Sequence, residues 1–168
     1  LELLNKFNKK EKLFNEEMKK IYKNRYTDYR NKYFNQFKHA EDLNFPLYIM
    51  LEQTYKCNLS CPSCIHGYDE TKAKYDVKDS PSVMEMELFK KIVDEASKFK
   101  CPSLAVMVND EPLLVKNIGE RIKYAKDKGF MDIIMTTNGN LWTEKKIKEV
   151  VEAGITRILF SVDAASQE

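Results

Sequence analysis

Three of the four cysteines fall close together, at Cys57, Cys61 and Cys64. Thiolates clustered on one loop can ligate iron and sulfide, and because a [4Fe-4S] cluster normally takes four cysteines, three would leave one iron open. His66 provides an alternative, since three cysteines and one histidine also make a structural zinc site. Unligated buried thiols are a third interpretation. The spacing favours an iron–sulfur cluster over zinc, and zinc over unligated thiols.

The composition is that of a globular protein. Of 168 residues, 28 are Lys or Arg and 26 are Asp or Glu, which gives a formal net charge of +2. No apolar run approaches the roughly 18 residues that a membrane-spanning helix needs. Clustered rather than dispersed cysteines indicate a reducing compartment, so we expect a cytoplasmic protein. The start without Met and the abrupt end suggest a fragment of a longer protein.

Apolar runs that read as strands alternate with helical segments after residue 45. The predicted strands are residues 46–54, 103–108, 131–136 and 156–162, and the predicted helices are 84–99, 115–128 and 143–153. This alternation predicts an α/β fold with a parallel sheet and right-handed crossovers. Four β/α units are too few to close a barrel, so we expect an open sheet or the first part of a larger barrel.

The first 44 residues differ in character from the rest. They hold 11 Lys or Arg against 7 Asp or Glu, whereas residues 45–168 hold 17 against 19. Apolar residues recur at helical intervals, which predicts one amphipathic helix or two short ones. We expect this extension to pack against the core or a partner domain, because its interleaved acidic residues weaken the case for binding nucleic acid.

Each of the later predicted strands ends in a polar motif. The motifs are Asn109-Asp110-Glu111-Pro112, Thr136-Thr137-Asn138-Gly139 and Ser161-Val162-Asp163. Ser161 and Asp163 are two residues apart on a strand and therefore point to the same face. The cysteines likewise follow the end of the first predicted strand, where α/β proteins place their ligand sites.

The cysteine order, followed by these three motifs, resembles the radical S-adenosylmethionine (SAM) superfamily. That resemblance implies a [4Fe-4S] cluster on Cys57, Cys61 and Cys64, with the amino and carboxylate groups of SAM on the fourth iron. It also implies SAM contacts by the motif residues. Those residues are Asn109, Asp110, Glu111, Pro112, Thr137, Asn138, Ser161 and Asp163.

The sequence departs from the family pattern in two places. Asn109 and Asp110 stand where the family has two glycines, and both are among the non-glycine residues most tolerant of left-handed backbone. Ser63 stands where an aromatic residue is usual near the adenine, so Ile65 or His66 is expected to take over that packing.

Three further residues have structural or functional interpretations. Glu52 and Gln53 follow the first strand as polar caps of the sheet or as substrate contacts. Cys101 precedes the second strand, away from the expected site, and is predicted to be a structural thiol.

The resemblance implies an enzyme with a partial (β/α)6 TIM-like barrel behind an N-terminal helical extension. It implies reductive cleavage of SAM to a 5′-deoxyadenosyl radical that abstracts hydrogen from a peptide, a sugar or a related substrate. A reducing donor such as flavodoxin or ferredoxin and a C-terminal SPASM-type cluster domain are further implications. An RNA-modifying radical SAM enzyme and a non-catalytic zinc-stabilised module remain alternatives. We expect the chain, as a fragment, to be inactive alone.

Overall fold

The computed structural model describes residues 2–35, 43–67 and 83–162. The chain divides into two compact units, Leu1–Leu47 and Tyr48–Glu168, and each is described by itself. Within the described ranges, no helix has both the length and the apolar character needed to span a membrane.

The first unit is a pair of helices, α1 (Glu2–Tyr22) and α2 (Asn24–Asn35). Of the two arrangements that the sequence allowed, two helices form, because Lys23 turns the chain with a φ of 51°. The phenol of Tyr26 then donates a hydrogen bond to Asn15 Oδ1 at 2.6 Å, which ties α2 back to α1.

Arg30 organises the aromatic residues of α2. Its guanidinium carbon lies 5.9, 5.4 and 4.6 Å from the ring centroids of Tyr29, Tyr33 and Phe34. Its Nη2 atom is 3.5 Å from Glu11 Oε1. Part of the basic charge of this unit is therefore paired with acidic and aromatic side chains of the same unit.

The second unit contains a four-stranded parallel sheet in the order β1-β2-β3-β4. The strands are β1 (Tyr48–Met50), β2 (Ser103–Ala105), β3 (Asp132–Thr137) and β4 (Arg157–Phe160). The predicted α/β class with a parallel sheet is confirmed. Sequential order with parallel pairing is the pattern of the first part of a β/α barrel.

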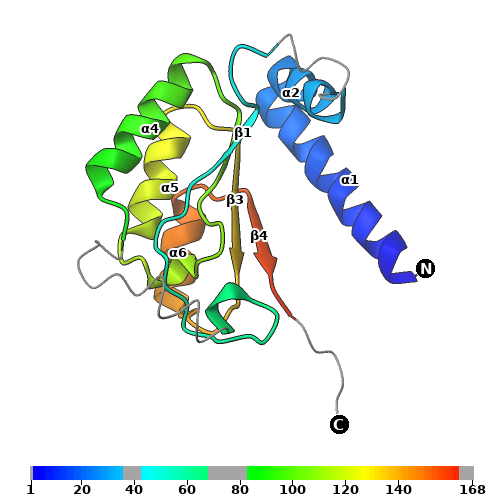
Figure 1. Cartoon of the computed structure of the whole chain (residues 1–168). Helices are drawn as coiled ribbons and strands as arrows, with labels where there is room; N and C mark the ends of the chain where they lie inside the picture. Colours follow the sequence, from blue (N-terminus) through cyan, green and yellow to red (C-terminus); the bar gives the residue numbers. More distant parts are fainter. Residues whose placement is uncertain (1, 36–42, 68–82, 163–168) are drawn as a thin grey trace. The chain divides into compact units, whose positions relative to one another are not determined.

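Three helices cover one face of the sheet: α4 (Met86–Lys98), α5 (Ile118–Asp127) and α6 (Glu144–Glu152). Gly129 and Gly154 follow α5 and α6 at φ values of 95° and 94°, as helix-terminating glycines do. Two short 3₁₀ helices, η2 (Ile65–Gly67) and η3 (Pro112–Leu114), were not predicted. Figure 1 shows the segment leading to η2 at the end of the sheet to which the arrows of β3 and β4 point.

The core lies between the helices and the sheet. Phe89 of α4 and Ile122 of α5 are fully buried with Leu104, Ile133 and Met135 of the central strands. Each such side chain stabilises the fold by about 1.5–3 kcal/mol through burial. The central strands are therefore firmly held, and the loops at their ends have a rigid base.

The first two strands are shorter than the predicted 46–54 and 103–108. The reason lies after β1, where the backbone N–H groups of Gln53 and Thr54 donate to the carboxylate of Asp110. The Asp110 side chain thus accepts the hydrogen bonds that a neighbouring strand would otherwise accept. The segments after β1 and β2 therefore leave the sheet early and form the loops of the site.

Candidate functional site

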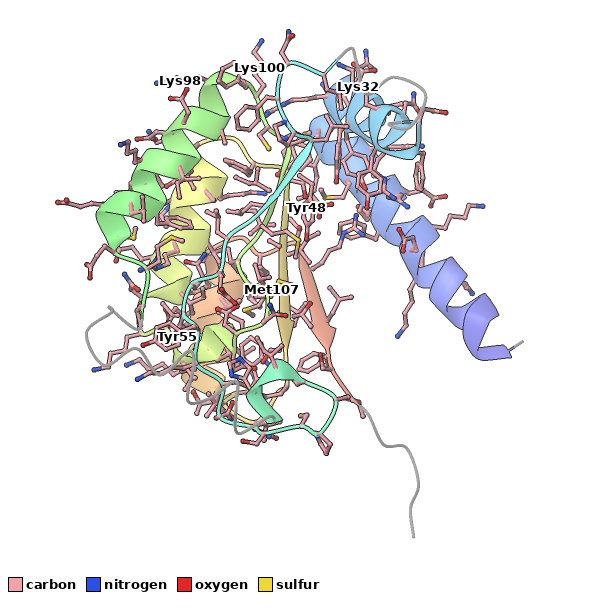
Figure 2. All side chains as sticks on the ribbon, viewed as in Figure 1. Lys32, Tyr48, Tyr55, Lys98, Lys100 and Met107 are labelled. Atoms are coloured by element: carbon pink, nitrogen blue, oxygen red, sulfur yellow. The ribbon has the colours of Figure 1, made fainter. Side chains whose placement is uncertain are left out.

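The cysteine loop is a tight turn after β1. Cys57, Cys61 and Cys64 are free and half-buried, and the N–H of Cys64 donates to Cys61 O at 3.0 Å. Gly67 allows this turn to close, because a Cβ there would lie 2.1 Å from Cys61 O. In Figure 2, Tyr55 marks this end of the unit and lies opposite Lys98 and Lys100 at the end of α4.

The three free thiols are a donor set that could bind iron and sulfide, but they are not gathered around one point. In the part of the chain that the structure describes, no three His, Cys, Asp or Glu side chains are placed to hold a single metal ion. His66, the expected fourth zinc ligand, has its Nε2 atom 2.8 Å from Asn109 O. A cluster of four irons binds each thiolate at a different iron, so its ligands need not converge on one point.

Glu111 is a buried carboxylate in the loop after β2, directly before η3, and is 1% exposed. Its Oε1 atom accepts hydrogen bonds from Thr137 Oγ1 at 2.7 Å and Leu113 N at 3.1 Å, and its Oε2 atom accepts from Asn138 N at 2.9 Å. No lysine or arginine of the described ranges forms an ion pair with it. A carboxylate has about four acceptor positions, so one remains for a further donor.

Asp110 ties the loop after β2 to the loop after β1. Its Oδ1 atom accepts from Val108 N at 2.8 Å, and its Oδ2 atom accepts from Gln53 N and Thr54 N, each at 3.2 Å. Burial raises the pKa of this carboxyl to about 6, against the lowering effect of these backbone donors, and the charge of Glu52 adds to the rise. The side chain is therefore a brace between loops.

Asn109 and Asp110, which stand where the family has two glycines, do not adopt a left-handed backbone conformation. Among described non-glycine residues only Lys23 and Lys100 have positive φ, so Asn109 and Asp110 adopt ordinary backbone conformations. The N–H of Asn109 donates to Glu52 Oε1 at 3.3 Å, which adds a second link between the same two loops.

Gln53 is fully buried and acts as a cap of the sheet. Its Nε2 atom donates to Leu51 O at 2.8 Å, and its Oε1 atom accepts from Arg121 Nη1 at 3.0 Å. Arg121 is itself buried and also donates to Asn117 Oδ1 and Met84 O, and burial lowers its pKa. The sequence analysis missed this pair, because no local pattern relates a strand end to a helix 68 positions later.

The remaining predicted site residues lie around Glu111. Pro112 is buried and begins η3, and Thr137 is buried as the last residue of β3. Ser161 is exposed and its N–H donates to Thr137 O at 2.9 Å. Asp163 lies outside the described residues. The structure thus brings the loops after β1, β2 and β3 together, with Ser161 beside them.

An aromatic pair near this site was not singled out from the sequence. The rings of Trp142 and Phe160 lie 6.3 Å apart, and Gly139, at a φ of 81°, leaves room for them because a Cβ there would approach Phe160 at 3.2 Å. Of the two residues expected to take over packing against the adenine, Ile65 is 41% exposed and His66 is half-buried.

Comparisons with known proteins agree with this geometry. The radical SAM superfamily matches residues 51–168. A tungsten-containing aldehyde ferredoxin oxidoreductase cofactor-modifying protein from Pyrococcus furiosus is 33% identical over 119 residues, which are 69% of this chain and 30% of that protein. GTP 3′,8-cyclase from Clostridium botulinum is 30% identical over 132 residues, which are 78% of this chain and 38% of the cyclase.

The fold is also found in a solved structure. The crystal structure of BtrN in complex with AdoMet and 2-DOIA superposes with a TM-score of 0.59 at 21% identity, over 73% of this chain and 48% of that chain. The chain thus spans less than half the length of each of these three proteins. The family match covers residues 51–168, from the residue directly after β1 through the three later motifs, and on that basis the chain belongs to the radical SAM superfamily.

Proposed function

We propose that the protein is a radical SAM enzyme in which Cys57, Cys61 and Cys64 hold a [4Fe-4S] cluster with one iron open to SAM. A bound, reduced cluster would supply the electron for reductive cleavage of SAM to methionine and a 5′-deoxyadenosyl radical, which would abstract a hydrogen atom from the substrate. The chain's own residues bind and orient SAM and keep water away from the reacting atoms.

Glu111 gives this proposal its strongest support. A buried carboxylate without a cation is costly, and it persists only where hydrogen bonds or a ligand compensate it. Glu111 keeps three neutral donors and one unused acceptor position at the edge of the sheet that carries three free thiols. The ammonium group of SAM provides the charge and the donors that this carboxylate lacks.

The other motif residues have supporting roles in the proposal. Thr137 orients Glu111 through its hydroxyl, and Asp110 braces the loop that carries it. The exposed hydroxyl of Ser161 is available to the ribose or methionyl part of SAM. Further SAM contacts are proposed for Asn109, Pro112, Asn138 and Asp163.

The substrate proposed is a peptide, a sugar or a related metabolite. The names of the two relatives refer to the modification of a cofactor and to the cyclisation of GTP, which supports a small molecule over RNA. Residues 1–44 are proposed as a helical extension outside a radical SAM core of residues 45–168. The internal pairing of Arg30 with Glu11 and of Lys20 with Glu17 weakens the case for RNA binding by this extension.

The proposal includes a reducing setting. Oxygen-sensitive thiolate-bound clusters need a reducing compartment, for which we propose the cytoplasm, and a one-electron donor such as flavodoxin or ferredoxin. A SPASM-type auxiliary cluster domain in the whole protein is part of the same proposal.

Anaerobic reconstitution of the 168-residue chain with iron and sulfide tests the proposal. We expect about four irons per chain, and an EPR spectrum of the dithionite-reduced protein that changes when SAM is added. Cys61→Ala is expected to lose the cluster, whereas Glu111→Gln is expected to keep the cluster and lose the response to SAM.

Two outcomes would count against the proposal. Zinc retained without iron would favour the zinc-stabilised module on Cys57, Cys61, Cys64 and His66. A cluster whose spectrum SAM leaves unchanged in the unaltered chain would remove the assigned role of Glu111.

A further inference from the structure

Asn138 is the one residue of the described loops that contacts both a cysteine thiol and Glu111. Its Nδ2 atom lies 3.7 Å from Cys57 Sγ and 2.8 Å from Asn58 Oδ1. Its backbone N–H donates to Glu111 Oε2 at 2.9 Å. One residue thus links the cysteine loop, through its side chain, to Glu111, through its backbone.

The orientation of the Asn138 amide is determined by its neighbours. The N–H of Asn140 donates to Asn138 Oδ1 at 3.0 Å, so the oxygen of the amide faces its own loop. The nitrogen must then face Cys57 and Asn58, and an amide nitrogen carries two hydrogens, one for each of these acceptors. The contact with Cys57 is therefore a donor contact to sulfur.

This contact distinguishes Cys57 from the other two cysteines. Among the described residues, no side chain donates to Cys61 Sγ or Cys64 Sγ. The difference follows from the fold: Asn138 comes directly after β3, and the N–H bond to Glu111 holds it at the edge where the loop after β1 passes.

We propose that Asn138 is a positioning residue that tunes the cluster, because its amide N–H donates to the Cys57 thiolate and raises the reduction potential of the cluster. The inference rests on the proposed function. Reduction adds negative charge that is shared by the thiolate sulfurs, and a donor to a sulfur stabilises that charge. Without the donor, the reduced state is less stable and the potential is more negative.

Asn138→Ala and Asn138→Asp separate the donor from the rest of the loop. Alanine removes the donor and also the acceptor of the Asn140 N–H, whereas aspartate removes the donor but keeps an acceptor for that N–H. Aspartate also places negative charge beside Cys57. Asn140→Ala is the matched control, because it keeps the backbone N–H that orients Asn138 and removes only an exposed side chain.

The readout is the midpoint potential of the reconstituted cluster, measured without SAM by EPR during a dithionite titration. We expect Asn138→Ala to lower the equilibrium constant for reduction by threefold to tenfold, or about 30 to 60 mV for a one-electron couple. Asn138→Asp is expected to lower it further, and Asn140→Ala is expected to match the unaltered chain.

The results distinguish this inference from the proposed function. If the unaltered chain assembles a SAM-responsive cluster and both Asn138 variants keep its potential, the inference is wrong and the proposed function stands. If only alanine lowers the potential, the loop bond to Asn140 and not the donor is responsible, which also overturns the inference. If the unaltered chain assembles no cluster, the proposed function fails and this inference fails with it.

Discussion

The buried carboxylates at the two ends of the sheet have different partners: one forms an ion pair, and the other accepts hydrogen bonds from neutral groups. Where β3 and β4 begin, Asp132 is 1% exposed and its two oxygens lie 3.0 and 2.9 Å from Nε and Nη2 of Arg157. In the loop after β2, Glu111 is equally buried but accepts, among the described residues, hydrogen bonds only from a hydroxyl and two backbone N–H groups. One charge is neutralised inside the chain, whereas the other is not.

We therefore expect Asp132 to contribute to the stability of the fold and Glu111 to contribute to ligand binding. A buried ion pair with both partners present is self-contained, and removal of one partner leaves an uncompensated charge. A buried carboxylate held only by neutral donors retains its attraction for a cation from outside. In β/α barrels the ends of the strands carry function and the beginnings carry stability, and these two carboxylates give that rule a physical cause in this chain.

The largest expected effect comes from Glu111→Gln. Glutamine keeps one oxygen for Thr137 and Leu113 but removes the charge that, in the proposed function, attracts the ammonium group of SAM. A charge-assisted hydrogen bond contributes about 1.5–3 kcal/mol, so SAM affinity is expected to fall by roughly tenfold to a hundredfold. Calorimetric titration of SAM into the reconstituted variant measures this, with iron content as the control. SAM binding equal to that of the unaltered chain would contradict the comparison.

Asp132→Asn tests the opposite end of the sheet. It leaves the guanidinium of Arg157 half-buried without its carboxylate, so the free energy of unfolding is expected to fall by about 3 kcal/mol. Urea unfolding of the metal-free chain measures the change. SAM affinity is expected to stay within twofold of that of the unaltered chain. A variant with normal stability and weakened SAM binding would reverse the assignment of the two ends.

The strands, the helices and the three cysteines were predictable because each has a local signal. Helical periodicity located α4, α5 and α6 within a few residues, and Gly129 and Gly154 marked two helix ends. The order of motifs after the strands placed Glu111 and Asn138 at one edge, and the structure brings them within hydrogen-bonding distance.

The braces of the site were not predictable, because they join residues far apart in sequence without any period. Asp110 was expected as a SAM contact at a position where the family has glycine, and the sequence did not indicate that its carboxylate accepts hydrogen bonds from two N–H groups more than 50 positions earlier. The same bonds end β1 before the predicted residue 54. Gln53 had two possible roles, and only the buried contact with Arg121 decided for the cap.

Asp110 is a third, half-buried carboxyl group and lies in the same loop as Glu111, where its negative charge lowers stability. Its pKa in the folded chain is about 6, above the 3.8 of an ordinary aspartate. The folded state therefore holds the proton more tightly, so the stabilisation is full below about pH 4 and is lost as the pH rises through about 6. The contribution of Asp110 to the free energy of unfolding is expected to fall by about 1 kcal/mol between about pH 5 and about pH 7.

Asp110→Gly provides the reference for this measurement, since it removes the titrating group and restores the family's residue. Urea unfolding of both metal-free chains over this pH range gives the difference in free energy of unfolding. We expect the advantage of the unaltered chain to be largest at the acidic end. An advantage that grows as the pH rises would show that the ionised carboxylate, and not the protonated one, stabilises the brace.

The smallest effect is expected at Cys101, which lies where β2 begins and thus at the structural end. Its side chain is 3% exposed, its thiol lies 3.6 Å from Ser103 O, and burial raises its pKa to about 11. At about pH 8 only about a thousandth of it is thiolate, so iodoacetamide is expected to modify three cysteines of the metal-free chain rapidly and Cys101 slowly. Cys101→Ala is expected to keep full iron content, whereas Cys61→Ala loses it. Equal modification rates for all four thiols, or loss of iron from Cys101→Ala, would contradict the structural role assigned to Cys101. Function would then not be confined to the loops that follow the strands.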